Sequence, residues 1–481
     1  RDQAGDRGLA GSCLVLCNSP ECSIAGGGNC GEIAVGHMKR LLVITRFFPP
    51  SSMIGGQRPL RVVRRIREFG WEPHVLTVPE RCCEPADPDL GRDVRATTHI
   101  ERVPCWNLYH HSIAWYPAKS IVRRAVLKAG RGVGYALSKF MPLDLDYLWA
   151  LAATRAGISM VRRLGVDLIW ATSPVNSTIL LAHRVSRATG VPFVADFRDV
   201  RPKLKASRMT GWNRRNVQIE RASLRGAAGI SVSAPVQRET LLAKHGAVVE
   251  KPFLLVHNWF EAEEAQGCTA KVFDRPTIIH GGVLYGGTRR LDGFLEALAL
   301  LRGNGASQEA RRLQFCQHGI ERTDKLLSAM SAKLGLSDTV VIGAYLDRQG
   351  FLSHCRGARI LLLAVGRNER GREHAQAIPG KLYDYFATQR PVLVVGPPDC
   401  EAGRMVERVH RGMAVADDAP GEIAEAIERL LDGKGRNGPL DLSAEAVSEF
   451  ESHSAIRRIA SFFDGVAGRG FGGVAAGSPC G

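Results

Sequence analysis

The chain has 481 residues, of which 45% are hydrophobic and 23% are charged. This composition is typical of a globular protein, and the length exceeds that of one typical domain, so we expect two domains. The formal net charge of +16 favours acidic partners, which are nucleotide phosphates, nucleic acid or an anionic membrane surface. The sequence contains no run of about 18 apolar residues, so we do not expect a membrane-spanning helix.

The twelve cysteines are scattered along the chain. Cys13, Cys17, Cys22 and Cys30 lie near its start without C-x-x-C spacing or histidine partners, so we expect no zinc site there. The other cysteines lie mostly in apolar segments, which is typical of reduced core thiols in a cytosolic protein.

The two ends of the chain differ from the rest in composition. Residues 1–37 are rich in glycine, serine and cysteine and begin with Arg1, whereas Met38 opens the strand-like run MKRLLVI. We expect 1–37 to be disordered or a non-native extension, and the glycine-rich tail 467–481 to be disordered.

From Met38 onward, apolar runs alternate with amphipathic segments, which predicts parallel α/β layers. The polar stretch 261–266 is the expected linker between two Rossmann-like domains, one at 38–260 and one at 270–442. The predicted strands of the first are 41–45, 74–78, 167–171, 192–196, 229–233 and 253–257, with helices at 58–69 and 176–189. Those of the second are 277–280, 313–318, 340–343, 360–364 and 391–395, with helices at 289–302 and 421–431.

A basic segment at 117–140 contains lysines and arginines but no acidic residue, with apolar residues interleaved at helical spacing. This pattern predicts an amphipathic segment that lies on an anionic membrane surface. The alternative is a helix face that is solvated or packed on its own domain.

The most informative stretch is 377–399, AIPGKLYDYFATQRPVLVVGPPD. Pro379 and Gly380 form a turn before a short amphipathic helix, and a helix start beside a turn suits a phosphate. Lys381 adds a positive charge there, and Asp384 can accept hydrogen bonds from sugar or ribose hydroxyls. The plainer interpretation is an ordinary βα unit with a polar helix start.

Further candidate loops follow the predicted strands, where open α/β sheets place their ligands. They are TRFFPP with the glycine pair Gly55-Gly56, DLIWATSPVNS, VADFRDV and IHGGVLYGGTRR. A glycine pair allows backbone N–H groups to approach a phosphate closely. The alternatives are a flexible loop at Gly55, an ion pair of Arg198 with Asp196 or Asp199, and surface arginines at 289–290.

These motifs together resemble the GT-B glycosyltransferases of family 4, over roughly residues 38–466. The resemblance implies an α/β fold of two Rossmann-like domains that face a cleft, with a final helix at 443–466 that crosses back to the first domain. It also implies a nucleotide-sugar donor, retention of the anomeric configuration, and neither a cofactor nor a metal. The sequence departs from the family at Val283, where a basic residue is usual, and at Gln376, where a glutamate is usual; Glu373 is a substitute for that glutamate only if its loop folds suitably.

The resemblance assigns roles residue by residue. Arg289, Arg290, Lys381 and Asp199 are the implied catalytic residues. The implied donor-binding residues are Gly281, Gly282, Pro379, Gly380, Lys381, Leu382 and Asp384. The implied acceptor-side or phosphate-loop residues are Gly55, Gly56, Gln57, Ser173, Asn176 and Arg198.

The expected function is therefore hexosyl transfer to a glycan or lipid-linked acceptor in cell-surface polysaccharide synthesis, in the cytoplasm or on the inner face of the plasma membrane. One alternative is a sugar-nucleotide epimerase on the same fold. Another is a degenerate protein that binds sugar nucleotides without catalysis. Nucleic acid is not an expected partner, because the basic residues are not interleaved with aromatic ones and no nucleic-acid motif occurs.

Overall fold

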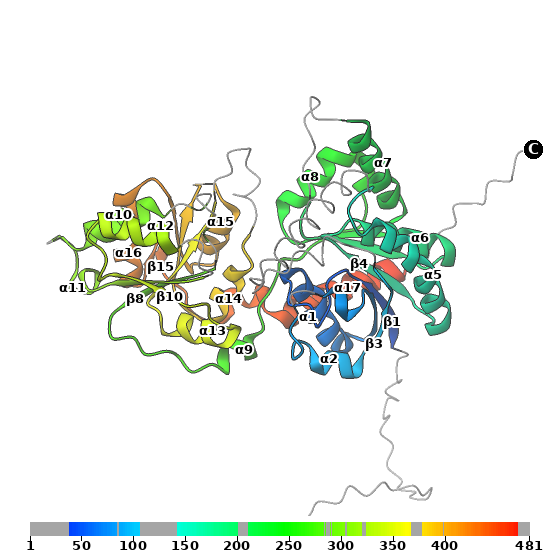
Figure 1. The fold of residues 1–481 in the computed structure, drawn as a ribbon, viewed down its shortest axis with the longest axis horizontal. Helices are drawn as coiled ribbons and strands as arrows, with labels where there is room; N and C mark the ends of the chain where they lie inside the picture. The colour runs from blue at the N-terminus through cyan, green and yellow to red at the C-terminus, as the bar shows by residue number, and fades with distance from the viewer. Residues whose placement is uncertain are drawn as a thin grey trace, which may run out of the picture. The chain divides into compact units, whose positions relative to one another are not determined.

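A computed structural model of the chain describes residues 38–83, 86–105, 142–200, 210–282, 284, 289, 291–303, 305–319, 324–366, 378–397 and 399–469. The expected extension 1–37, the basic segment 117–140 and most of the tail 467–481 lie outside these residues. The described residues form two α/β halves, each built on its own parallel sheet (Figure 1).

The first sheet has seven strands in the order β3-β2-β1-β4-β5-β6-β7, all paired in parallel. The chain runs outward from β1 to β3 and then returns to the other side of β1, so the strand order reverses between β1 and β4. Ligands of open α/β sheets bind at such a reversal. The strands are β1 (Lys39–Ile44), β2 (Trp71–Thr77), β3 (His99–Arg102), β4 (Leu168–Thr172), β5 (Phe193–Phe197), β6 (Gly229–Val232) and β7 (Phe253–Leu255).

Helices cover both faces of this sheet, which is why central strands such as β1 and β4 are mainly apolar. Successive residues of β1 point to opposite faces: Leu42 packs with α5 and α6, and Leu41 packs with α1 and the last helix. Gly70 ends the segment after α1 in the left-handed conformation, with φ 81°. The helices are α1 (Gln57–Arg65), α2 (Arg92–Thr97), α5 (Tyr147–Leu164), α6 (Ser177–Thr189), α7 (Gly211–Gly226) and α8 (Pro235–His245).

The second sheet has six parallel strands in the order β10-β9-β8-β11-β12-β13, with its own reversal between β8 and β11. The strands are β8 (Thr277–Gly281), β9 (Gln314–His318), β10 (Val340–Gly343), β11 (Ile360–Ala364), β12 (Val392–Gly396) and β13 (Gly412–Ala416). The helices are α10 (Asp292–Leu301), α11 (Gln308–Arg311), α12 (Asp324–Lys333), α13 (Arg348–Gly357), α14 (Lys381–Ala387), α15 (Glu401–Arg408) and α16 (Pro420–Leu431).

Two segments connect the halves. The predicted linker is a short helix, α9 (Ala262–Gln266), and the predicted final helix is divided into a 3-10 turn, η7 (Glu445–Phe450), and α17 (Ser452–Ala467). Phe463 of α17 packs edge-on against Trp71 of the first sheet, with ring centroids 5.8 Å apart. The chain therefore returns to its first half after completing the second sheet. The predicted fold class, two Rossmann-like α/β halves, is confirmed.

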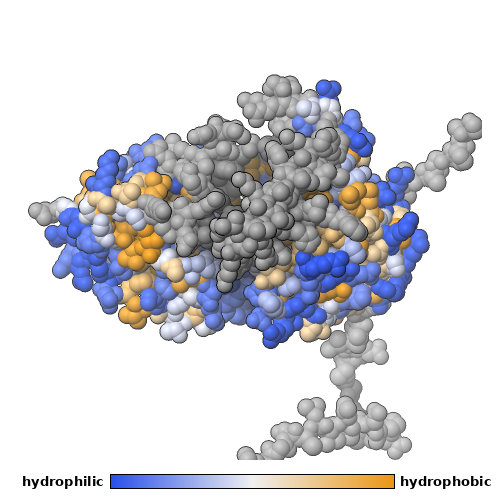
Figure 2. All heavy atoms as spheres, in the orientation of Figure 1, coloured by the Kyte–Doolittle hydropathy of each residue, from blue (hydrophilic) through white to orange (hydrophobic). Residues whose placement is uncertain are grey.

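The surface of the described residues is mainly hydrophilic on the face shown in Figure 2, with hydrophobic residues in scattered patches. None of the described helices is both long and apolar enough to cross a membrane. The cysteines that the structure describes are buried, as expected for core thiols: Cys82, Cys83, Cys105, Cys268, Cys316, Cys355 and Cys400.

Candidate active site

A cavity of about 790 Å³ is lined by residues from both halves of the fold. The lining segments follow the carboxyl ends of β1, β4, β5, β6, β7 and β8, and helices α13 and α14 contribute their first turns. Its lining residues are Phe47, Met53, Ile54, Gly55, Gln57, Arg58, Arg61, Pro174, Arg198, Asp199, Val200, Ser233, Ala234, Val236, Gln237, Thr240, Asn258, Trp259, Gly282, Arg289, Arg348, Ile378, Pro379, Gly380, Lys381, Tyr383 and Asp384.

The ammonium group of Lys381 lies where the second half borders this cavity. Lys381 is the first residue of α14, and its Nζ donates to the carbonyl of Gly281 and lies 3.2 Å from His280 Nε2. Gly282 has a φ of +104°, and a Cβ at that position would lie 3.0 Å from Lys381 Nζ. Only glycine therefore suits position 282, both for its backbone conformation and for the close approach of the ammonium group.

Positive charge is concentrated around Lys381. Burial, then the neighbouring Arg289, lowers the pKa of Lys381 to about 7, although Cys355 and Asp384 act in the opposite direction. Arg289 also lines the cavity. An anion bound between these two cations would offset both the desolvation and the repulsion. This part of the cavity therefore suits a phosphate or diphosphate group.

Asp384 lines the cavity one turn further along α14 and is held by an ion pair. Its Oδ1 lies 3.0 Å from Arg348 Nη2, and Arg348 Nε donates to Glu264 of α9 at 2.6 Å. Arg348 thereby links α14 to α9, the helix that connects the two halves.

Arg198 dominates the part of the cavity that belongs to the first half. Its Nε donates to the carbonyl of Ser173 at 2.6 Å, and its Nη1 donates to the carbonyl of Gly55. Ser173 Oγ donates to Asn176 Oδ1 at 3.0 Å. The guanidinium group thus joins the loops after β1 and β4, and burial lowers the pKa of Arg198 to about 10.

Comparison with known proteins shows a similarity in sequence over part of the chain and a shared fold. Residues 55–259 match the model of the glycosyl transferase 4-like domain. The fold resembles that of HepE from Anabaena in complex with UDP, with a TM-score of 0.55 and 12% identity over 89% of this chain and 100% of that chain. The chain therefore has the GT-B fold, and much of its first half is similar to the glycosyl transferase 4-like domain.

Two further solved structures show the same fold at low identity. The lipopolysaccharide outer core galactosyltransferase WaaB aligns with a TM-score of 0.53 and 10% identity, over 89% of this chain and 99% of WaaB. The N-terminal domain of trehalose-6-phosphate phosphatase from Candida albicans aligns with a TM-score of 0.51 and 12% identity, over 89% and 96% of the two chains. No curated protein sequence matches this chain significantly.

The structure brings most of the predicted site residues to one cavity. The predicted residues in its lining are Gly55, Gln57, Arg198, Asp199, Gly282, Arg289, Pro379, Gly380, Lys381 and Asp384. Arg290, Val283, Glu373 and Gln376 lie outside the residues that the structure describes.

Other predicted residues lie behind the lining. Leu382 is fully buried among apolar side chains, because it faces away from the cavity on α14. Gly281 contributes its carbonyl to Lys381, and a Cβ there would lie 2.1 Å from the ring of Phe351. Ser173, Asn176 and Gly56 shape the loops that bear lining residues but do not line the cavity themselves.

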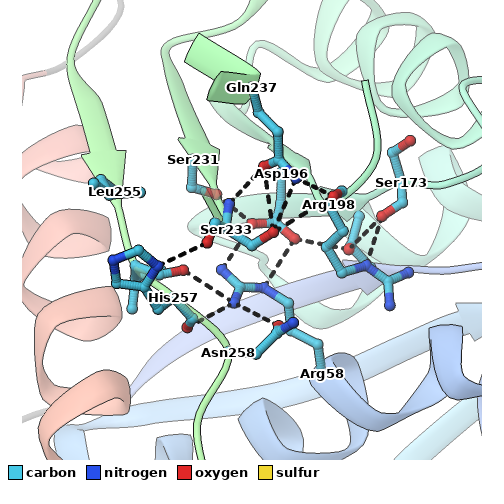
Figure 3. A network of polar contacts seen from close by, with 12 residues as sticks. Arg58, Ser173, Asp196, Arg198, Ser231, Ser233, Gln237, Leu255, His257 and Asn258 are labelled. Carbon is cyan, nitrogen blue, oxygen red and sulfur yellow. Dashed lines mark hydrogen bonds and ion pairs between the residues drawn. The ribbon is translucent and has the colours of Figure 1, made fainter. Parts of the chain in front are cut away.

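Sequence analysis missed a buried polar network beneath the cavity (Figure 3). Asp196 pairs with Arg58, not with Arg198, at 3.1 Å between Asp196 Oδ1 and Arg58 Nη2. The hydroxyls of Thr172 and Ser231 also donate to Asp196, at 2.8 and 2.7 Å. The available signal was a lone carboxylate at the end of an apolar strand, which needs a partner when it is buried.

The contacts of Lys381 with His280 and of Asp384 with Arg348 were missed as well. Within the described parts of the chain, no three or more histidine, cysteine, aspartate or glutamate side chains are grouped so that they could hold a metal ion.

Proposed function

We propose that this protein is a glycosyltransferase, which transfers a hexosyl group from a nucleotide-sugar donor to a glycan or lipid-linked acceptor with retention of the anomeric configuration. The observation that carries the proposal is the pair of cations, Lys381 and Arg289, on the lining of a 790 Å³ cavity. The structures of HepE contain UDP and UDP-glucose, which supports the same class of ligand here.

The chemical contribution of the cations is electrostatic. Negative charge grows on the diphosphate as the glycosidic bond breaks, and the Lys381 and Arg289 cations stabilise that charge in a partly desolvated site. Asp384 accepts hydrogen bonds from the ribose hydroxyls of the donor. The acceptor hydroxyl approaches from the loops of Gly55 and Arg198 and gives its proton to the leaving phosphate on the same face of the sugar.

The reaction needs neither a cofactor nor a metal in this proposal, because side-chain cations neutralise the diphosphate. We place the enzyme in cell-surface polysaccharide synthesis, in the cytoplasm or on the inner face of the plasma membrane. The basic composition of 117–140 supports contact with an anionic membrane surface.

Ligand-induced thermal stabilisation tests the donor site. UDP, GDP, ADP, dTDP and their common sugars are added to the protein, to Lys381→Ala and to a control, Lys333→Ala, which alters an exposed lysine in the same half. Ligand binding to the native state raises Tm according to affinity and concentration. We expect one diphosphate family to stabilise the protein and the control but not Lys381→Ala. If none of these nucleotides stabilises the protein, the proposal is refuted.

Product analysis separates transfer from the alternatives. Release of the nucleoside diphosphate with a glycosylated acceptor supports transfer, and the anomeric configuration of the product tests retention. An epimerised sugar nucleotide would indicate an epimerase. Nucleotide binding without any product would indicate the degenerate binding protein.

A further inference from the structure

A chain of three buried or partly buried polar side chains extends from the cavity into the second sheet. Lys381 Nζ lies 3.2 Å from His280 Nε2, and His280 Nδ1 lies 2.6 Å from Gln317 Oε1. Gln317 Nε2 in turn donates to the carbonyl of Gly282 at 2.8 Å. His280 is the fourth residue of β8 and Gln317 the fourth of β9, and the two are directly paired across the sheet. Both side chains have no exposed surface.

The direction of the hydrogen bonds follows from the two contacts that the Gln317 side-chain amide makes. Gln317 uses its NH₂ group to reach Gly282, so its Oε1 faces the histidine as an acceptor. His280 must then carry its proton on Nδ1. Burial, then the nearby Lys381, holds the pKa of His280 well below its usual value, so the ring is neutral. A neutral ring protonated on Nδ1 presents a lone pair on Nε2 to the ammonium group of Lys381.

The other titratable groups around Lys381 do not replace this acceptor. Burial raises the pKa of the Cys355 thiol and of the Tyr385 phenol, so both are neutral. Arg289 is a cation and opposes the ammonium charge. Asp384 is attractive, but its Oδ1 is already paired with Arg348. His280 Nε2 and the carbonyl of Gly281 are thus the direct acceptors of the ammonium group among the described residues.

We propose that His280 is a positioning residue of the donor site: its Nε2 accepts from Lys381 and favours the protonated form of that lysine, and Gln317 fixes the tautomer that this contact requires. Binding of a nucleoside diphosphate is then linked to protonation of Lys381. The link to the nucleotide rests on the proposed function. A Lys381 pKa of about 7 means that the free enzyme loses the ammonium charge near neutral pH, whereas a bound diphosphate retains it. Nucleoside diphosphate affinity therefore falls as pH rises above neutrality.

The first experiment needs no nucleotide. Competitive labelling with acetic anhydride modifies the neutral amine, so the labelling rate of Lys381 as a function of pH, relative to exposed Lys333, gives its titration midpoint. His280→Leu removes the acceptor of the Lys381 ammonium group. Gln317→Met removes the amide oxygen that keeps the His280 proton on Nδ1. In His280→Gln, the new amide oxygen can restore an acceptor for Lys381. Loss of the acceptor disfavours the ammonium form, so we expect the midpoint to fall by about one pH unit in His280→Leu and Gln317→Met, and to recover in His280→Gln.

A merely structural role for His280 would lower Tm without moving the midpoint, and unchanged midpoints in both His280→Leu and Gln317→Met would overturn the inference. If His280→Leu does not fold, Gln317→Met decides the outcome alone.

The second experiment measures the affinity for UDP, GDP, ADP and dTDP against pH. We expect the pH at which affinity declines to move with the labelling midpoint. A shifted midpoint in a protein that binds none of these nucleotides would refute the proposed function and the nucleotide link, while leaving the His280–Lys381 contact established.

Discussion

Arg58 and Asp196 form a buried two-point ion pair, with Arg58 Nη2 3.1 Å from Asp196 Oδ1 and Arg58 Nε 3.2 Å from Asp196 Oδ2. Arg58 also donates through Nη1 to the carbonyls of Val256 and His257, each at 3.2 Å. The pair therefore joins the start of α1 to the end of β5 and to the segment after β7. It fixes the floor under the part of the cavity that the first half supplies.

Replacement of Arg58 by methionine is expected to destabilise the protein strongly. The change leaves the Asp196 carboxylate buried without its cation, which costs about 3–5 kcal/mol of unfolding free energy. Urea denaturation measures this loss. The matched control is Arg64→Met on the same helix, because Arg64 pairs with Asp93 at the surface and such pairs contribute at most about 1 kcal/mol. Equal losses of unfolding free energy in the two variants would show that the Arg58–Asp196 pair stabilises the fold no more than a surface ion pair does.

Removal of the Arg198 guanidinium group is expected to impair acceptor use more than donor binding. Arg198→Met breaks the contacts that hold the Gly55 and Ser173 loops together. A misplaced loop of this kind lowers kcat/KM by about 100-fold. Steady-state kinetics with the acceptor varied at saturating donor checks this, beside a control, Arg187→Met, at an exposed position of α6. An equally large loss of nucleoside diphosphate affinity would show instead that Arg198 serves the donor.

Local patterns in the sequence were sufficient to predict the fold and most of the cavity loops. Strands such as β4 and β11 are continuous apolar runs because helices cover both faces of their sheets, and Gly70 marked a helix end that the structure shows. Glycines, prolines and charges after those runs marked the loops. The sequence did not show that Leu382 faces the core, since neighbouring residues on a helix point about 100° apart; Lys381 and Asp384 line the cavity, whereas the Leu382 side chain is buried.

Long-range pairing was beyond sequence reasoning. Arg58 and Asp196 are 138 residues apart, and Lys381 and His280 are 101 apart. A single charged residue in an apolar segment indicates that a partner exists, because an unpaired buried charge is costly, but it does not say which of many residues the partner is. Only the register of neighbouring parallel strands and the crossover helices between them bring these side chains together.

Loss of the Asp384 charge is expected to weaken contact with the ribose specifically. If Asp384 accepts hydrogen bonds from the ribose hydroxyls, Asp384→Asn should lower nucleoside diphosphate affinity about tenfold, the loss expected for a hydrogen bond to a charged group. A 2′,3′-dideoxynucleoside diphosphate should bind the variant and the parent protein equally. Isothermal titration with both ligands measures the difference. The same tenfold loss for the dideoxy ligand would assign Asp384 to positioning of α14 through Arg348 rather than to ribose binding.

Substitution of Gly282 by alanine is expected to displace the Lys381 ammonium group. Residue 282 has a φ of +104°, and the new Cβ would lie 3.0 Å from Nζ, so either the backbone or the lysine must move. We expect Tm to fall and nucleoside diphosphate binding to decrease together. Gly421→Ala is the control, because a Cβ there meets nothing within 4 Å and its φ is not in the left-handed range. Unaltered nucleotide affinity in Gly282→Ala would exclude a close fit between this glycine and Lys381.

The Asp144 carboxylate gives the fold a specific dependence of stability on pH. It accepts hydrogen bonds from the backbone N–H and hydroxyl of Ser177 at the start of α6, at 2.9 and 2.6 Å. Burial, then the neighbouring Asp146, nevertheless raises the pKa of Asp144 to about 6. A pKa that is higher in the folded than in the unfolded state means that the contribution to stability is complete below about pH 4 and is lost as pH rises through 6.

Asp144→Asn removes this titration, because the side-chain amide oxygen can still accept from the Ser177 backbone while carrying no charge. The unfolding free energy of the parent protein relative to the variant should therefore be greatest near pH 4 and fall by up to about 3 kcal/mol by pH 7. Urea denaturation of both proteins between pH 4 and pH 7 measures that difference, and subtraction removes the titrations that the two share. A difference that stays constant across this range would mean that Asp144 ionises normally in the folded protein, and that the Ser177 contacts outweigh its burial.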